Sequence, residues 1–160
     1  MKILIVSDTH RDTSNFYKAV EQNAPLDMVI HLGDVEGSDF GMRRAAGCPM
    51  EIVAGNSDFF SDLPREKEIE IEGYKILLTH GNFYLVTLGM ERIREEGRER
   101  GVDIVMFGHT HRPLLDIDDE ELMLINPGSL SFPRQEGKRP SYIIMEIDEK
   151  GELQFELKYI

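Results

Sequence analysis

Five short apolar runs, each followed by a residue that can bind a metal ion, constrain the fold of this chain most strongly. In one of them, Ile104-Val-Met-Phe leads to Gly108 and then to two histidines, His109 and His111. An unbroken apolar run with β-branched residues is typical of a central strand that is covered on both faces. Gly108 is expected to let the backbone turn sharply after this strand. Four other runs end in the same way, in the segments Ile3–His10, Val29–Asp34, Ile52–Asn56 and Ile76–His80.

The residues that follow these runs form a set of candidate metal ligands. In open α/β sheets ligands bind beyond the carboxyl ends of the strands, so these side chains are expected to lie close together. Imidazole and carboxylate donors without cysteine suit manganese, iron, nickel, cobalt or zinc, and a set of this size exceeds what one ion can use. We therefore expect two divalent ions, with manganese preferred and one carboxylate shared between them. The candidate ligands are Asp8, His10, Asp34, Asn56, His80, His109 and His111.

The first third of the chain alternates strands and helices. Strands are predicted at residues 2–7, 28–32 and 50–54 from their apolar runs. One helix is predicted to start near Thr13 or Ser14, either of which can cap it, and to end at Asn23-Ala-Pro-Leu. A second helix is predicted over residues 38–46. This order implies parallel pairing of the strands with right-handed crossovers.

The pattern changes after residue 58. Residues 67–72 alternate polar with apolar side chains, and Gly73 permits a tight turn into residues 74–79. This pattern predicts a hairpin with one face exposed to solvent. A helix over Val86–Arg100 and a strand at 102–107 are predicted next. Short antiparallel segments are predicted at 114–117, 122–126, 142–147 and 153–159, with turns at Asp118-Asp119 and Lys150-Gly151. We expect two packed sheets flanked by helices, with the second sheet largely antiparallel.

Length, charge and hydropathy restrict the possible functions. With 160 residues the chain suits one domain over residues 1–160. No apolar run approaches the ~18 residues of a membrane helix, and Met1-Lys2 enters a strand without a secretory signal, so a cytoplasmic protein without a membrane partner is expected. The net charge of −12 disfavours extended nucleic acid as a partner. The single cysteine, Cys48, is expected to be a partly buried small residue. Homo-oligomer formation stays open.

These motifs give the chain a resemblance to the calcineurin-like metallophosphoesterases, and within them to the small bacterial and archaeal phosphodiesterase branch. The match runs nearly end to end, through Asp8-Thr-His10, Gly33-Asp34, Gly55-Asn56, His80-Gly81 and Gly108-His-Thr-His111. The resemblance implies a four-layer α/β/β/α sandwich of two packed mixed sheets flanked by helices. It also implies a division of the ligands, in which Asp8, His10 and His111 hold one ion, Asn56, His80 and His109 hold the other, and Asp34 bridges them.

Two departures from the family pattern narrow the expected chemistry. Many members carry a histidine after the Gly-Asn asparagine, where it protonates the leaving group, whereas this chain has Ser57. A serine hydroxyl is too weak an acid for that role, and the neighbouring Asp58 is the alternative proton donor. Protein phosphatases of the family carry an Asp-Arg pair after Gly-Asp, but Val35-Glu36-Gly37 lacks it, which disfavours phosphoprotein substrates. The block Asn126–Ser129 resembles one that is typical of the small branch, so its loop is expected beside the metals, with a plain turn as the alternative.

The resulting hypothesis is a metal-dependent phosphodiesterase that hydrolyses a small phosphodiester by in-line attack of a hydroxide bridging the two ions. Asn56 is assigned a catalytic role as a ligand that also orients the phosphate, and Arg11 and Arg134 are candidate phosphate contacts. His31 lies inside its run and is expected to be a core or supporting residue. The alternative is a protein-binding scaffold, because the retromer subunit Vps29 resembles the same small fold. The full ligand set favours the enzyme.

Overall fold

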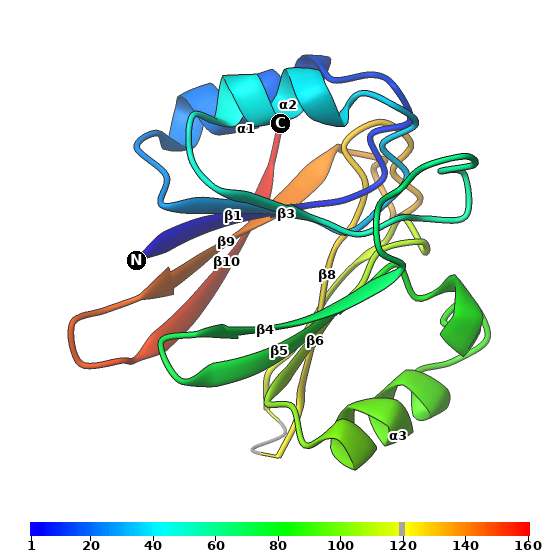
Figure 1. Ribbon diagram of the computed structural model, residues 1–160, viewed down its shortest axis with the longest axis vertical. Coiled ribbons are helices and arrows are strands. Elements are labelled where there is room, and N and C mark those ends of the chain that lie inside the picture. Colours follow the sequence, from blue (N-terminus) through cyan, green and yellow to red (C-terminus); the bar gives the residue numbers. More distant parts are fainter. Residues whose placement is uncertain (119–120) are drawn as a thin grey trace.

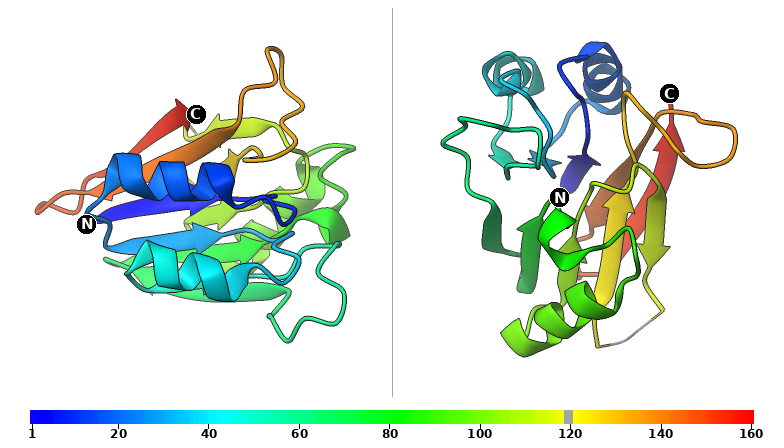
Figure 2. Two further views of the ribbon diagram at one scale, coloured as in Figure 1. Left: turned by 90° about the horizontal axis from the view of Figure 1, so that it is seen from above. Right: turned by 90° about the vertical axis from the view of Figure 1, so that its right-hand side faces the viewer.

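The structure, a computed structural model that describes residues 1–118 and 121–160, contains two five-stranded sheets packed face to face (Figure 1). The elements are β1 (Lys2–Val6), α1 (Ser14–Asn23), β2 (Met28–His31), α2 (Asp39–Ala46), β3 (Met50–Ile52), β4 (Glu66–Ile71), β5 (Tyr74–Thr79), the 3₁₀ turn η1 (Asn82–Tyr84), α3 (Glu91–Arg100), β6 (Ile104–Met106), β7 (Pro113–Asp116), β8 (Met123–Pro127), β9 (Ser141–Ile147) and β10 (Leu153–Tyr159). Helices α1 and α2 lie over the outer face of one sheet, and α3 lies over the outer face of the other (Figure 2). The expected four-layer sandwich is confirmed.

The first sheet has the order β10-β9-β1-β2-β3. As the strand and helix alternation predicts, β1, β2 and β3 are parallel neighbours, with Ile3 beside Met28 and Val29 beside Met50. On the other edge of β1, strand β9 pairs with β1 in an antiparallel way, and β10 pairs with β9 in the same way. Six of the seven residues of β9 are buried, because one face of this strand packs against the second sheet and the other belongs to the cluster beneath α1 and α2.

The second sheet has the order β4-β5-β6-β8-β7. Its three central strands are parallel, and only the edge strands β4 and β7 pair in an antiparallel way. The expectation of a largely antiparallel second sheet is therefore wrong, because β9 and β10 join the first sheet instead. The predicted hairpin is confirmed: β4 exposes Lys67, Glu68 and Glu70 and turns Ile71 inward.

Alternate side chains of the central strands enter different layers of the core. In β1, Ile3 and Ile5 pack between the two sheets, whereas Leu4 and Val6 pack beneath α1 and α2. In β5, Leu78 faces the other sheet and Leu77 packs beneath α3. Burial of each such side chain stabilises the fold by about 1.5–3 kcal/mol before entropy is counted. The unbroken apolar runs therefore belong to strands that are covered on both faces.

Helix α1 has the predicted ends but not the predicted cap, and helix α3 starts later than predicted. Helix α1 begins at Ser14, but Thr13 makes no side-chain capping bond, and the carboxylate of Asp12 accepts the backbone N–H of Ser14 instead. Helix α3 begins at Glu91 rather than at Val86, because Leu85 has a φ of 53° and the chain between them forms turns. Val86 is buried nevertheless, which explains why the apolar pattern continued across the break.

Two smaller predictions concern a side chain and two turns. Cys48 is partly buried and packs beside the core under α2, as expected. The turn at Lys150-Gly151 is confirmed by a bond from the Gly151 N–H to the Asp148 carbonyl. The predicted turn at Asp118-Asp119 extends to residue 119, which lies outside the described residues. Within the described part of the chain, no helix has the length and apolar composition needed to cross a membrane.

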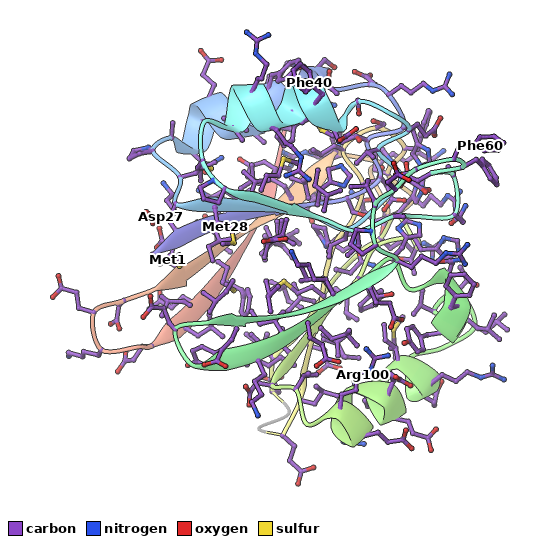
Figure 3. All side chains as sticks on the ribbon, viewed as in Figure 1. Met1, Asp27, Met28, Phe40, Phe60 and Arg100 are labelled. Atoms are coloured by element: carbon purple, nitrogen blue, oxygen red, sulfur yellow. The ribbon has the colours of Figure 1, made fainter. Side chains whose placement is uncertain are left out.

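The parallel strands of both sheets point their carboxyl ends toward the same side of the molecule. Met1 and Met28 mark the opposite side in Figure 3, and Phe60, in the loop after β3, projects from the side where the loops gather. Backbone hydrogen bonds join these loops to one another: the Asp8 N–H donates to the Gly33 carbonyl at 3.0 Å, and the Gly108 N–H donates to the His80 carbonyl at 3.1 Å. The candidate ligands from the two sheets therefore meet in one place.

Candidate metal centre

Three histidines at this place are held in the same tautomer by their neighbours. Nδ1 of His80 donates to the Leu32 carbonyl and Nδ1 of His111 donates to the Phe132 carbonyl, both at 2.7 Å. A carbonyl oxygen only accepts, so these Nδ1 atoms carry the hydrogen and Nε2 keeps a lone pair. Nδ1 of His10 faces a Glu36 carboxylate oxygen at 2.8 Å, which has the same effect. Such outer contacts are typical of histidines that bind metal through Nε2.

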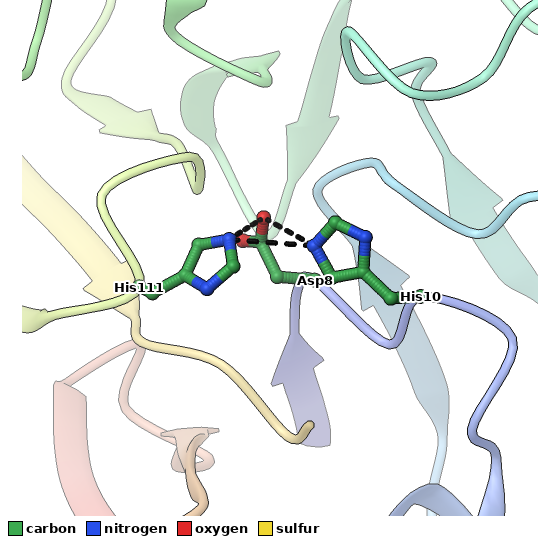
Figure 4. Close-up of side chains that lie close together, drawn as sticks. All are labelled: Asp8, His10 and His111. Carbon is green, nitrogen blue, oxygen red and sulfur yellow. Dashed lines mark hydrogen bonds and ion pairs between the residues drawn. The ribbon is translucent and has the colours of Figure 1, made fainter. Parts of the chain in front are cut away.

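The three Nε2 atoms converge on one carboxylate oxygen, Oδ1 of the fully buried Asp8. They lie 3.0 Å (His111), 3.7 Å (His10) and 3.9 Å (His80) from it. Figure 4 shows His10 and His111 on either side of this carboxylate, with their Nε2 atoms 3.3 Å apart. Among the residues that the structure describes, Asp8 Oδ1 has no hydrogen-bond partner. Nitrogen and oxygen atoms that face one another in this way repel unless a proton or a metal ion lies between them, and this set of donors fits a metal ion.

The ligand atoms form two clusters rather than one. Asp8, His10 and His111 make up the first, and Asp8, Asp34 and His80 make up the second. Oδ2 of Asp34 lies 3.6 Å from Nε2 of His10 and 3.5 Å from Nε2 of His80, between the two clusters. Two adjacent sites that share carboxylates are the arrangement of a binuclear centre.

Asn56 and His109 lie at the edge of the clusters. The Asn56 Oδ1 atom is 3.1 Å from Nε2 of His80, and the Asn56 side chain is exposed. The ring of His109 packs edge-on against that of His80 with centroids 5.1 Å apart, and it belongs to neither cluster. The backbone N–H of His109 donates to Oδ2 of Asp8 at 3.1 Å. The structure thus brings six of the seven candidates into direct proximity and places the His109 ring beside them.

The loops that carry these residues have an uncommon backbone conformation. Asp8, His10, Asp34, His109 and His111 all have φ between 43° and 67°. Non-glycine residues enter this left-handed region rarely, at a cost of about 1–3 kcal/mol each, and they do so most often at functional sites. The surrounding hydrogen bonds therefore hold the ligands in positions that the free chain would avoid.

The chain turns tightly after Gly108, with a bond from the Thr110 N–H to the Gly108 carbonyl at 2.8 Å, but the φ of Gly108 itself is not in the left-handed region. A Cβ atom at this position would lie 2.0 Å from Oγ of Ser7 and 2.8 Å from Oδ2 of Asp8. The glycine is required because the loop after β6 passes directly over the Asp8 carboxylate.

The charges of the clustered groups are strongly coupled. Burial opposes ionisation of Asp8, but the adjacent His10 and His111 imidazoles outweigh it and lower the pKa of this carboxyl group. The contact with Asp8 raises the pKa of His10 to about 9, against the effect of burial and with help from Glu36. His10 therefore carries a proton near neutral pH that a metal ion must displace.

Asp58, weighed above as a proton donor, has another role in the structure. Its Oδ2 atom accepts the backbone N–H groups of Asp34 (2.8 Å) and Gly55 (2.7 Å), and its Oδ1 atom accepts that of Glu36 (2.6 Å). The carboxylate thus fastens the loop after β2 to the loop after β3. The only local signal for this role is an acidic residue in a Gly-Asn-Ser turn, a type that often binds nearby backbone.

Other supporting residues also surround the clusters. His31 is fully buried, accepts the Gly33 N–H at Nδ1 (3.2 Å) and contacts Oγ1 of Thr9 through Nε2 (3.1 Å), as expected of a supporting residue. Burial lowers the pKa of His31 to about 3, so it is neutral. Glu36, which orients His10, was missed, because nothing in its sequence context marks the contact.

The block Asn126–Ser129 packs beside the clusters, as its resemblance to the small branch implied. Asn126 Nδ2 donates to the Gly108 carbonyl at 2.8 Å, and Ser129 Oγ donates to the Asp8 carbonyl at 2.9 Å. The loop that follows it closes one side of a cavity of about 700 Å³. The cavity is lined by His10, Asp34, Asn56, Ser57, His109, His111, Ser131, Phe132, Pro133, Arg134 and Lys138. Arg11, one of the two candidate phosphate contacts, instead pairs with Glu36 at 3.0 Å.

The sequence matches the family model of the calcineurin-like phosphoesterase superfamily domain over residues 1–150. The chain belongs to this superfamily. A probable metallophosphoesterase of Methanocaldococcus jannaschii is 36% identical over 137 residues, which cover 84% of this chain and 70% of the relative. A phosphodiesterase of the same organism is 32% identical over 148 residues, covering 80% of this chain and 83% of the relative. This calcineurin-like chain is thus a phosphoester hydrolase with buried Asp and His clusters suited to divalent metal.

Vps29 shares the fold of this calcineurin-like domain. A single-site variant of Vps29 from Entamoeba histolytica superposes with a TM-score of 0.79, covering 100% of this chain and 99% of that one, at 22% sequence identity. At this identity the likeness shows the fold alone.

Proposed function

We propose that this protein is a binuclear metal-dependent phosphodiesterase acting on small phosphodiesters. The observation that carries the proposal is the convergence of three histidine Nε2 atoms on Oδ1 of the buried Asp8, an oxygen without a hydrogen-bond partner among the described residues. Asp8, His10 and His111 would hold one ion, Asn56, His80 and His109 would hold the other, and Asp34 would bridge them. Manganese is our first candidate, and iron, cobalt, nickel and zinc suit the same donors.

The ions, when bound, would supply Lewis acidity and a water molecule of lowered pKa for in-line attack. The protein's own groups fix the geometry around them. Ser57 holds Asp34 through two bonds, from its N–H to Oδ1 at 2.8 Å and from its hydroxyl to Oδ2 at 3.1 Å. Asn56 stands exposed at the cavity, where its amide can orient a phosphate oxygen. Because its hydroxyl serves Asp34, Ser57 is not placed to protonate a leaving group.

The test is a comparison of phosphodiester and phosphomonoester hydrolysis by protein loaded with manganese. We expect hydrolysis of bis(p-nitrophenyl) phosphate that a chelator abolishes and that added manganese restores. The same protein should hydrolyse p-nitrophenyl phosphate more slowly. If metal-loaded protein hydrolyses neither ester, a scaffold role like that of Vps29 becomes the better account.

Asp34→Asn provides the matched variant. Even outer contacts of a metal site are worth about 10–100-fold in affinity or activity, so loss of the shared carboxylate should lower activity by at least about 100-fold. Asp62→Asn, a change of the same charge at an exposed position outside the site, should leave activity unchanged. Two tightly bound ions and near-normal turnover in Asp34→Asn would remove Asp34 from the bridging position.

A further inference from the structure

Two basic side chains line the same cavity as the metal-ligand candidates. Arg134 and Lys138 lie in the loop between β8 and β9. Across residues 1–118 and 121–160, neither side chain makes an ion pair or a hydrogen bond. By contrast, Arg11 pairs with Glu36 and Arg100 pairs with Glu66. In a protein with a net charge of −12, two unpaired cations beside a cavity create a local site for an anionic group.

An aromatic ring lies in the same wall of the cavity. Phe132 is 58% exposed, and its ring makes a T-shaped contact with the ring of His10, with centroids 5.3 Å apart. Its backbone is fixed, because its carbonyl accepts Nδ1 of His111 and its N–H donates to Oγ of Ser129. An exposed aromatic face on a rigid backbone is a surface on which a nucleobase can stack.

The third observation concerns the leaving group. Ser57 is occupied with Asp34, and both carboxylate oxygens of Asp58 accept backbone N–H groups. Neither residue is therefore available to protonate an alkoxide as it departs. A leaving group that is itself a phosphate ester needs no such proton, because the second pKa of a phosphate monoester is only about 6.

Building on the proposed function, we infer that the substrate is a nucleotide pyrophosphate diester, in which two phosphates are joined through a bridging oxygen. The attacked phosphate would lie over the metal ions that the proposed function assigns to the cavity, the second phosphate lies against Arg134 and Lys138, and the base stacks on Phe132. The oxygen of a water molecule bonds to the attacked phosphorus, and the bond from that phosphorus to the bridging oxygen breaks. The bridging oxygen leaves with the electron pair as part of the second phosphate, and the protons of the water pass to solvent.

The chain offers a matched control for the two cations. Arg139 lies in the same loop and has the same charge, but it stacks on the ring of Tyr159 at 4.7 Å and does not line the cavity. The experiment compares the parent protein, Arg134→Gln/Lys138→Gln and Arg139→Gln, all loaded with manganese. The two substrates are diadenosine diphosphate and bis(p-nitrophenyl) phosphate, which lacks a second phosphate.

We expect the parent protein to prefer diadenosine diphosphate by kcat/KM. In the double variant this preference should fall about 10- to 100-fold, the effect of losing charge-assisted hydrogen bonds to one phosphate. Arg139→Gln should keep it. A separate calorimetric measurement of ADP binding, at a fixed manganese concentration, should show a similar loss of affinity in the double variant alone.

Hydrolysis of the aryl diester without hydrolysis of diadenosine diphosphate would overturn the inference while the proposed function stands. An unchanged preference in the double variant, or an equal loss in Arg139→Gln, would also overturn it. If metal-loaded protein hydrolyses neither ester, the proposed function fails and ADP binding decides the inference. Equal ADP affinity in the parent and the double variant would then exclude the phosphate site, whereas a loss confined to the double variant would support it.

Discussion

The Asp58 carboxylate accepts three backbone N–H groups from the two loops that carry Asp34 and Asn56. Replacing it by alanine leaves these donors without their partner and frees the two loops from each other. We expect Asp58→Ala to lower the affinity for manganese about 10–100-fold, as is typical when a group that orients metal ligands is lost. The free energy of unfolding should also fall by about 1–3 kcal/mol.

Calorimetric titration with manganese and denaturant unfolding measure the two effects. Asp62→Ala is the control, because Asp62 lies in the same loop, is exposed and makes no hydrogen bond or ion pair within the described residues. Normal manganese affinity in Asp58→Ala would show that the loops keep their geometry without this carboxylate.

His10 predicts how metal binding depends on pH. Its pKa is raised to about 9 in the folded protein, chiefly by Asp8, from an ordinary value of 6.5. Because the folded protein holds this proton more tightly than the unfolded chain, protonated His10 contributes to the free energy of unfolding of the metal-free protein. The contribution is fully present below pH 6.5 and is lost as the pH rises through about 9. A metal ion must displace the same proton, so the affinity for manganese should increase from pH 6 to pH 9.

Competition with a chelator of known affinity, measured at several pH values, tests this prediction. Calorimetry at pH 7 in buffers of different ionisation enthalpy should show release of about one proton from this histidine. A manganese affinity that does not change with pH would mean that His10 is neutral before the metal binds.

At the scale of elements, α3 packs closely on the second sheet at Gly97. Gly97 faces the sheet, and a Cβ atom there would lie 2.7 Å from Cγ2 of Val105 and 2.9 Å from a methyl group of Leu122. Alanine usually stabilises a helix interior by about 0.5–1 kcal/mol relative to glycine. Here we expect Gly97→Ala to destabilise the protein by about 1–3 kcal/mol, because the added carbon overpacks the contact.

Urea unfolding of Gly97→Ala measures this effect, and Glu95→Ala on the exposed face of the same helix is its control. The control should change the free energy of unfolding by less than about 0.5 kcal/mol. A stabilised Gly97→Ala would show that α3 can move away from β6 at little cost. Arg100, labelled in Figure 3, lies at the end of α3. Its ion pair with Glu66 at 2.8 Å also joins the helix to the sheet.

The elements also show what could be predicted from sequence. The apolar runs located the central strands, since an unbroken run needs cover on both faces wherever its neighbours lie. The predicted start of α3 was wrong, because Val86 lies in a turn and is buried there as fully as it would be in a helix. The return of β9 to pair with β1 joins residues more than 130 positions apart, and no local pattern specifies that.

In the candidate site, too, local sequence patterns predicted some residues, whereas residues that act through long-range contacts could not be predicted. Asp8, Asp34 and His80 each follow an apolar run after one intervening residue, so their position beyond the strand ends could be predicted. Glu36 and Asp58 could not, because their roles depend on where the His10 ring and the N–H groups of other loops lie.

At the scale of the whole molecule, the distribution of charge limits what can approach the site. The net charge of −12 repels long polyanions. The cavity of about 700 Å³, by contrast, is lined by the metal-ligand candidates and also by the basic residues Arg134 and Lys138. A small anion can therefore reach the clusters where an extended nucleic acid is disfavoured. Both sheets contribute to this arrangement, because the first carries Asp8 and Asp34 and the second carries His80 and His111.

The most direct test of a binuclear centre is anomalous diffraction from crystals of the protein loaded with manganese. We predict two anomalous peaks separated by about 3.5–4 Å. One peak should lie at Nε2 of His10 and His111, the other should lie at Nε2 of His80, and Asp34 should contact both. A single peak, or two peaks that do not share the Asp34 carboxylate, would contradict the account.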